Sequence, residues 1–191
     1  MEEKAIQLFA EILRFPTVSA TGPSSGSYNK CGQWLLERCS EIGLDAKIIP
    51  ESKENKPIVV AEWLGTDPRL PCIHLNSHYD VVPIIEGSWT VPPFEGHREN
   101  GRVYGRGAQD MKCVVVQYLV AIERLKQSGY SPLRTVRLSF VPDEEIGGVH
   151  GMKILMSSQW FSETEIAIAL DEVTAPPLPS PVYSPLISPA V

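Results

Sequence analysis

One histidine and seven carboxylates stand next to apolar runs of this sequence, where side chains of these types could bind a metal ion. They are His78, Asp80, Asp110, Asp143, Glu144, Glu145, Asp171 and Glu172. So many carboxylates repel one another unless a cation compensates their charge. One imidazole with several carboxylates suits zinc and would tolerate manganese or cobalt. Two such ions sharing a carboxylate would form a hydrolytic centre.

Each group also has a plain structural explanation when it is taken alone. Asp110 directly precedes a predicted helix and could be its N-cap. Glu144 and Glu145 could lie on a solvated loop, and Asp171 with Glu172 could form a turn. The joint pattern favours a metal centre, because most of these groups follow predicted strands and parallel sheets build their sites at the carboxyl ends of strands.

The elements that must position these groups follow from hydrophobic periodicity. Strands are predicted at 46–49, 58–64, 72–77, 135–141 and 166–170, and helices at 4–15, 28–42, 111–127 and from 152 to 156. Loops are predicted over 19–27 and over most of 81–107, which are rich in Gly, Pro and Ser. Strands that alternate with helices predict an α/β fold with a mixed, largely parallel sheet.

Composition excludes several classes of protein. The chain has 191 residues, 43% of them hydrophobic, and a net charge of −6, so we expect a globular chain and no nucleic-acid partner. We expect no membrane span and no signal peptide, which predicts a cytoplasmic protein. Its 4 cysteines form no CxxC pair and are expected to be reduced.

The last segment differs in character from the rest. Residues 174–191 contain six prolines, a density that no regular element tolerates. We therefore expect a domain over residues 1–173 and a disordered, proline-rich tail over 174–191.

Four ordered motifs carry a resemblance to a known family. They are NSHYDVVP at 76–83, GRGAQDMK at 105–112, VPDEEIGG at 141–148 and ALDE at 169–172. Together they resemble the di-zinc aminoacylase and exopeptidase family, and most of all its aminoacylase members. The resemblance implies a three-layer zinc-peptidase-like domain of which this chain holds the N-terminal part, so that the sheet is incomplete at its C-terminal end.

The resemblance implies a role for six residues. His78 and Glu172 would bind the first zinc, Glu145 the second, and Asp110 would bridge the two ions. Asp80 would hydrogen-bond the far nitrogen of His78. Glu144 would be the general base, which takes a proton from water and passes it to the leaving amine. The peptide bond from Asp110 to Met111 would be cis.

The implied reaction is zinc-dependent hydrolysis of N-acyl-L-amino acids to a carboxylate and a free amino acid. The alternatives are a dipeptidase or carboxypeptidase of the same family, or a non-catalytic fragment that binds zinc or a full-length partner. Family members carry a lid and dimerisation domain and a fifth ligand, a histidine, which have no counterpart here. We therefore expect the second zinc to bind weakly and hydrolysis to be slow or absent. A homodimer is expected for full-length family members but not for this chain.

The remaining candidates are given structural roles. His74 lies on the strand that leads to His78 and is expected to be structural, whereas His97 and His150 are expected on exposed loops. Arg106 is expected to brace its loop. Trp89 is expected to pack its loop over the sheet, and Met111 and Cys113 to pack rather than bind metal.

Overall fold

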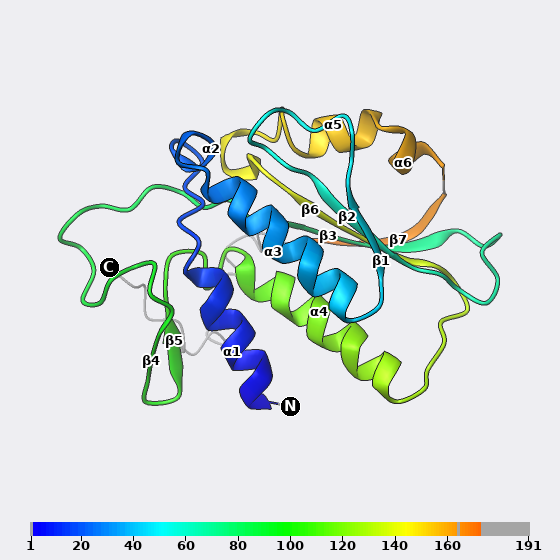
Figure 1. The fold of residues 1–191 in the computed structure, drawn as a ribbon, viewed down its shortest axis with the longest axis horizontal. Helices are drawn as coiled ribbons and strands as arrows, with labels where there is room; N and C mark the ends of the chain where they lie inside the picture. The colour runs from blue at the N-terminus through cyan, green and yellow to red at the C-terminus, as the bar shows by residue number, and fades with distance from the viewer. Residues whose placement is uncertain (1, 164, 173–191) are drawn as a thin grey trace, which may run out of the picture.

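A five-stranded sheet lies at the centre of the computed structural model, which describes residues 2–163 and 165–172. The strands follow the order β1 (Asp45–Ile48), β2 (Val59–Trp63), β6 (Val136–Val141), β3 (Cys72–His78), β7 (Ile166–Leu170). The main helices are α1 (Glu2–Leu13), α3 (Ser27–Glu41), α4 (Lys112–Gln127), α5 (Met152–Ser157) and α6 (Gln159–Ser162) (Figure 1). The predicted tail over 174–191 lies outside the described residues.

The fold has three layers, with helices on both faces of the sheet, and the side chains of β2 point alternately to the two faces. Val59 and Ala61 belong to the core cluster formed with α1, α3 and α4, whereas Val60 belongs to a second cluster with Leu155 and Trp160 of α5 and α6. Successive side chains of a strand point to opposite faces, so the two clusters lie on opposite faces of the sheet. The predicted α/β fold is confirmed.

The sheet is mixed, as predicted, and its parallel part carries the candidate site. β3 pairs in parallel with β6 on one side and with β7 on the other, while β1–β2 and β2–β6 are antiparallel. Parallel pairing thus covers only half of the sheet. The carboxyl ends of β3, β6 and β7 meet at one edge, to which they bring the groups that follow them.

A buried lysine fixes the segment that precedes α4. Lys112 is fully buried, and its Nζ donates hydrogen bonds to the backbone oxygens of Phe15, at 2.7 Å, and of Ile12, at 3.3 Å. These carbonyls lie at the C-terminal end of α1, where a cation is favoured. Burial lowers the pKa of Lys112 to about 8. This contact ties α4 and the preceding Asp110 to α1.

Two segments predicted as loops contain short elements. β4 (His97–Glu99) and β5 (Arg102–Tyr104) form a hairpin, so the prediction of a loop position for His97 is wrong. Asn100 and Gly101 turn between the strands with φ of 51° and 75°, which is the backbone that an Asn-Gly hairpin turn requires. The second element is the short helix α2 (Gly22–Ser25), whose start is favoured by a proline.

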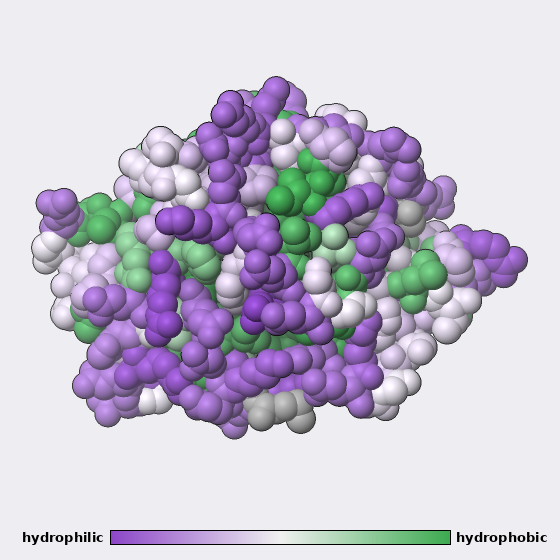
Figure 2. Space-filling model, in the orientation of Figure 1, coloured by the Kyte–Doolittle hydropathy of each residue, from purple (hydrophilic) through white to green (hydrophobic). Residues whose placement is uncertain are grey.

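The outer surface over α1 and α4 is mainly hydrophilic (Figure 2), because the apolar faces of these helices pack against the sheet. Among the described residues, no helix combines the length and apolar character that a bilayer crossing requires. The cysteines at 31, 39, 72 and 113 are all free, as predicted.

Candidate metal centre

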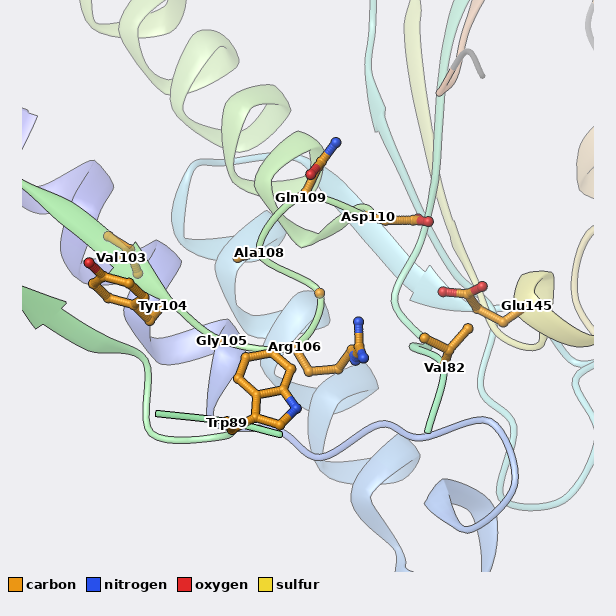
Figure 3. Close-up of a pocket in the computed structure, with 11 residues that line it drawn as sticks. Val82, Trp89, Val103, Tyr104, Gly105, Arg106, Ala108, Gln109, Asp110 and Glu145 are labelled. Atoms are coloured by element: carbon orange, nitrogen blue, oxygen red, sulfur yellow. The ribbon is translucent and has the colours of Figure 1, made fainter. Parts of the chain in front are cut away.

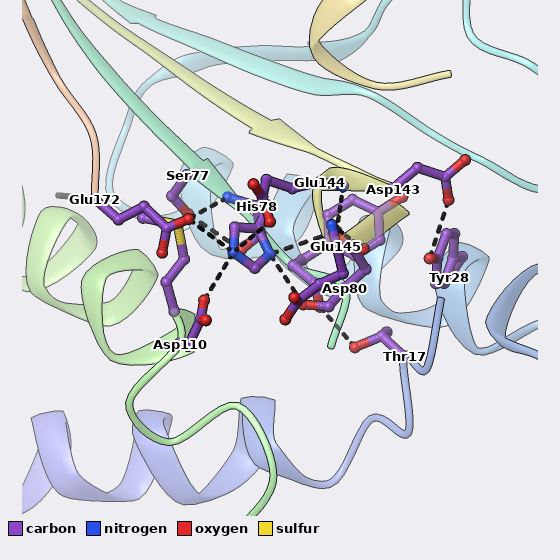
Figure 4. Close-up of polar contacts among 12 residues, drawn as sticks. Thr17, Tyr28, Ser77, His78, Asp80, Asp110, Asp143, Glu144, Glu145 and Glu172 are labelled. Carbon is purple, nitrogen blue, oxygen red and sulfur yellow. Dashed lines mark hydrogen bonds and ion pairs between the residues drawn. The ribbon is translucent and has the colours of Figure 1, made fainter. Parts of the chain in front are cut away.

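His78, the last residue of β3, lies at the centre of a cluster of carboxylates (Figure 4). Its side chain is buried, and its Nε2 lies 3.0 Å from Oδ1 of Asp110 and 3.5 Å from Oε1 of Glu172. Oε2 of Glu144 lies 3.7 Å from the same nitrogen. Residues from the ends of three parallel strands and from the start of α4 are therefore brought to one imidazole nitrogen.

The donor set of this cluster fits a metal ion. His78, Asp110 and Glu172 each offer one ligand atom, and these three atoms lie within 4.8 Å of one another. Among the described residues this is the one such group of three or more histidine, cysteine or acidic side chains. A nitrogen ligand and carboxylate oxygens are the combination that zinc accepts.

The electrostatics of the cluster favour a bound cation. Burial lowers the pKa of His78, but the hydrogen bond and charge of Asp80, with the charges of Glu172 and Asp110, outweigh it and raise the pKa to about 9. Burial and the charge of Asp110 raise the pKa of Glu172 to about 7. Both groups hold protons more tightly than usual, Glu172 through burial and neighbouring negative charge and His78 through neighbouring negative charge, and a metal ion would compensate that charge.

Asp80 connects the imidazole to the loop that follows β6. It is fully buried; its main-chain oxygen lies 3.0 Å from Nδ1 of His78, and its carboxylate Oδ1 lies 3.4 Å from that nitrogen. The carboxylate also accepts hydrogen bonds from the backbone N–H groups of Glu144, at 3.0 Å, and Glu145, at 3.2 Å. Asp80 thus contacts the far nitrogen of His78, through its main-chain oxygen more closely than through its carboxylate, and it also holds the loop. The role that the resemblance implies for it stays a prediction.

Glu144 and Glu145 lie on a tight 3-10 turn, Glu144–Ile146, directly after β6. The turn is flanked by Asp143 and Gly147, with φ of 62° and 92°. Glu145 lies outside the three-residue ligand group; with Asp110 it lines one side of a pocket of about 540 Å³ (Figure 3). Burial and the charge of Asp110 raise the pKa of Glu145.

Two of the eight groups turn away from His78. The buried Asp143 faces the opposite side of the loop. There it accepts a hydrogen bond from Tyr28 Oη at 3.1 Å and forms an ion pair with Lys56. Asp171 instead accepts a hydrogen bond from Asn76 Nδ2 at 2.7 Å. These two carboxylates therefore have partners other than His78, although they also follow the ends of β6 and β7. No sequence signal singled out Lys56 or Tyr28.

The residues around Asp110 follow the sequence predictions. The peptide bond from Asp110 to Met111 is cis. Met111 is buried, and its sulfur accepts a hydrogen bond from the backbone N–H of His78 at 3.3 Å. Met111 therefore packs under the site, as expected.

His150 lies outside the helices and strands and is partly exposed, with its Nδ1 3.4 Å from Asp143.

His74 has the structural position that its place on the strand predicts. It is buried at 2% exposure, with its Nε2 2.9 Å from Oγ of Ser139 on the neighbouring β6. Burial, with the positive charge of Arg137, lowers the pKa of His74 to about 4. The native fold therefore holds this ring neutral.

This pKa predicts a loss of stability in mild acid. The unfolded chain binds the His74 proton near pH 6.5 and the folded chain only near pH 4, so stability falls as the pH drops between these values. The contribution to the free energy of unfolding between pH 7 and pH 5 is about 2 kcal/mol. Urea titrations of His74→Gln should show a pH dependence weaker by this amount, with His97→Gln as the control. An unchanged dependence would contradict the prediction.

Comparisons with known proteins identify a metallopeptidase family and its fold, in agreement with the sheet and the candidate metal centre described above. The model of peptidase family M20/M25/M40 matches residues 74–182. Aminoacylase-1 of Sus scrofa is 41% identical over 177 residues, which cover 92% of this chain and 42% of that protein. The chain thus spans less than half the length of the curated relatives that it matches.

Two solved structures share the architecture. One is an M20 family metallo-carboxypeptidase, Sso-CP2 from Sulfolobus solfataricus, with a TM-score of 0.75, 25% identity, and coverage of 90% of this chain and 38% of that chain. The other is human carnosine dipeptidase 1, with a TM-score of 0.76, 19% identity and the same coverage, 90% and 38%.

Proposed function

Because this chain belongs to peptidase family M20/M25/M40, we propose that it carries part of a zinc-dependent centre that hydrolyses N-acyl-L-amino acids. The products are a carboxylate and a free amino acid. The observation that supports this most is the position of His78 Nε2, 3.0 Å from Asp110 and 3.5 Å from Glu172. We assign residues 1–173 to the N-terminal part of the catalytic domain, in a cytoplasmic protein.

Four residues would hold the metal. His78 and Glu172 would bind one zinc ion, Glu145 a second, and Asp110 both. The second ion should bind more weakly, because Asp110 and Glu145 alone give it few ligands. When bound, zinc would act as a Lewis acid that lowers the pKa of water and polarises a carbonyl group.

The protein's own part in the reaction is to move a proton. The side chain of Glu144 is 49% exposed and lies 3.7 Å from Nε2 of His78, so it is near the centre without being enclosed by it. A carboxylate in this position can take a proton from water and return it to the leaving amine. The buried Asp80 keeps Glu144 beside His78, because it contacts both.

The proposal is tested by a substrate panel with the zinc-loaded chain. N-acetyl-L-methionine should be cleaved, slowly, and faster than unmodified dipeptides, and cleavage should stop after metal removal and return with zinc. Glu144→Gln should remove the activity while zinc content stays unchanged, and Glu99→Gln on β4 is the matched control. Cleavage that continues without metal, or in Glu144→Gln, would refute the proposal.

A dipeptidase or carboxypeptidase is the second candidate. The fold matches human carnosine dipeptidase 1 and the carboxypeptidase Sso-CP2 with TM-scores of 0.76 and 0.75. The sequence favours the aminoacylase, at 41% identity, over a probable carboxypeptidase S-like relative, at 34%. Faster cleavage of dipeptides in the same panel would select the second candidate.

A further inference from the structure

A row of buried polar side chains crosses the parallel part of the sheet and ends beside the candidate metal centre. Asn76 of β3 and Ser139 of β6 are register partners, and His74 lies two residues before Asn76, on the same face of β3. The exposed fractions of Asn76, Ser139 and His74 are only 7%, 0% and 2%. The row reaches the rim of the sheet at Asp171, which directly follows β7. Burying polar groups is costly unless they are hydrogen-bonded, and each of these three has a partner within the row.

Hydrogen bonds join these four side chains, which together form the rim network. Nε2 of His74 lies 2.9 Å from Oγ of Ser139. This Oγ donates to Oδ1 of Asn76 at 2.5 Å, and Nδ2 of Asn76 donates to Oδ2 of Asp171 at 2.7 Å. The other carboxylate oxygen of Asp171, Oδ1, accepts a hydrogen bond from the backbone N–H of Glu172 at 2.9 Å. The rim network therefore ends on the main chain of a proposed metal ligand.

The carboxylate at the end of the rim network fixes the direction of its hydrogen bonds. An ionised carboxylate only accepts, so Asn76 must turn its NH2 group to Asp171 and its oxygen to Ser139. The serine hydroxyl donates to that oxygen and is left to accept from Nε2 of His74. His74 is therefore the neutral tautomer with its proton on Nε2. Burial and the charge of Arg137, which lower the pKa of His74 to about 4, agree with a neutral ring.

Two aromatic side chains of α6 hold the imidazole at the buried end of the rim network. The ring centres of Trp160 and Phe161 lie 6.1 and 5.8 Å from that of His74, and both contacts are edge-to-face. These distances are within the range in which aromatic rings attract one another. The rim network is thus anchored in the packed layer between the sheet and α6.

Packing alone holds the other end of the rim network only loosely. In the described part of the chain, β7 is an edge strand that pairs with β3 and with no other strand. All 5 of its residues are exposed. A segment with few buried contacts moves more freely than the core. The position of Glu172, two residues beyond β7, therefore depends strongly on hydrogen bonds.

We propose that the rim network positions Glu172 as a metal ligand, an assignment that rests on the proposed function. Its members are positioning residues, which act through the main chain of Glu172. The Glu172 side chain extends to His78, with Oε1 3.5 Å from Nε2 (Figure 4). Asp171 thus does for Glu172 what Asp80 does for Glu144, since each carboxylate accepts the backbone N–H of a site residue.

Zinc affinity tests this assignment, because a network that only stabilised the sheet would leave the affinity of the folded chain unchanged. Zinc is titrated into the metal-free chain against a chelating indicator. Asn76→Ala should weaken binding of the tighter zinc ion by about 10- to 100-fold, as is usual for partners of metal ligands. Ser139→Ala should weaken it by about 2- to 10-fold, the effect of one hydrogen bond. The double variant should bind zinc as Asn76→Ala does, because both changes act through one chain of bonds.

Thr135→Val is the matched control. It also removes a buried hydroxyl, which accepts a hydrogen bond from the backbone N–H of Gly65 at 3.2 Å, just before the opposite end of β6. It should lose stability and keep the zinc affinity of the wild type. Melting temperature and circular dichroism are measured for every variant; if Asn76→Ala is unfolded, Ser139→Ala decides.

The tautomer of His74 gives a second readout that needs no metal. NMR of the ring nitrogens at neutral pH should show an uncharged imidazole with its proton on Nε2. A proton on Nδ1 instead would overturn the assignment, because the Ser139 hydroxyl would then donate to His74 and could not donate to Asn76. Unchanged zinc affinity in the folded variants, an equal loss in Thr135→Val, or additive losses in the double variant would overturn it as well.

Failure of the assignment can be told from failure of the proposed function. Zinc affinity is measured without turnover, and hydrolysis is followed separately. The expected losses of affinity in a chain that hydrolyses nothing support the assignment and refute the hydrolase. Zinc-dependent hydrolysis with unchanged affinity in the variants refutes the assignment and leaves the hydrolase standing. A folded wild type that binds no zinc overturns both.

Discussion

His78→Ala is expected to remove tight zinc binding from this chain. His78 is the buried imidazole, proposed as the nitrogen ligand, around which Asp110 and Glu172 gather at 3.0 and 3.5 Å. Replacing even an outer partner of a metal ligand costs about 10- to 100-fold in affinity, so losing the ligand itself should cost more than about 100-fold. The three carboxylates left around the vacant position would also repel one another.

The measurement is zinc retained after dialysis against metal-free buffer, followed by competition with a chelator. His97→Ala, on the β4–β5 hairpin, is the control and should keep zinc as the wild type does. Circular dichroism checks that the variant is folded, since His78 is buried. If His78→Ala retains zinc with wild-type affinity, the metal centre proposed here is wrong.

Lys56→Met is expected to destabilise the fold by about 3–5 kcal/mol. Lys56 pairs with Asp143, whose side chain is only 2% exposed. Without the ammonium group, the Asp143 carboxylate stays buried with the Tyr28 hydroxyl and His150 as its polar neighbours. A buried charge that loses its counter-ion is strongly destabilising, whereas removing both partners costs much less.

Urea denaturation measures this effect. Lys53→Met, at an exposed position three residues earlier, is the control and should change the free energy of unfolding by less than about 0.5 kcal/mol. The double variant Lys56→Met, Asp143→Asn should recover part of the lost stability, because it removes the charge itself. Equal stabilities for Lys56→Met and Lys53→Met would show that the pair contributes little.

Periodicity predicted most of the regular elements, since long apolar patterns identify helices and buried strands. It did not predict the β4–β5 hairpin, which depends on the positive φ angles of Asn100 and Gly101 rather than on an apolar pattern. The Asn-Gly pair is a recognised hairpin signal and would have indicated the turn. The sequence predicted a mixed sheet but not which strands pair antiparallel, because alternation in sequence does not fix how β1 and β2 pair.

The sequence identified the chemistry of the site better than its geometry. Asp171 and Glu172 are adjacent just after β7, yet Asp171 accepts a hydrogen bond from Asn76 while Glu172 faces His78. Asp143 and Glu144 are separated by the left-handed backbone of Asp143. Sequence distance alone cannot distinguish such neighbours, and the ligand roles themselves stay predictions.

The carboxylate of Asp80 makes two parts of the centre mechanically dependent on each other. It contacts the imidazole of His78 and also the main chain of Glu144 and Glu145. Any shift of the ring is therefore transmitted to the 3-10 turn through one rigid group. If His78 binds metal and Glu144 moves the proton, as proposed, a change at Asp80 should alter metal affinity and proton transfer together.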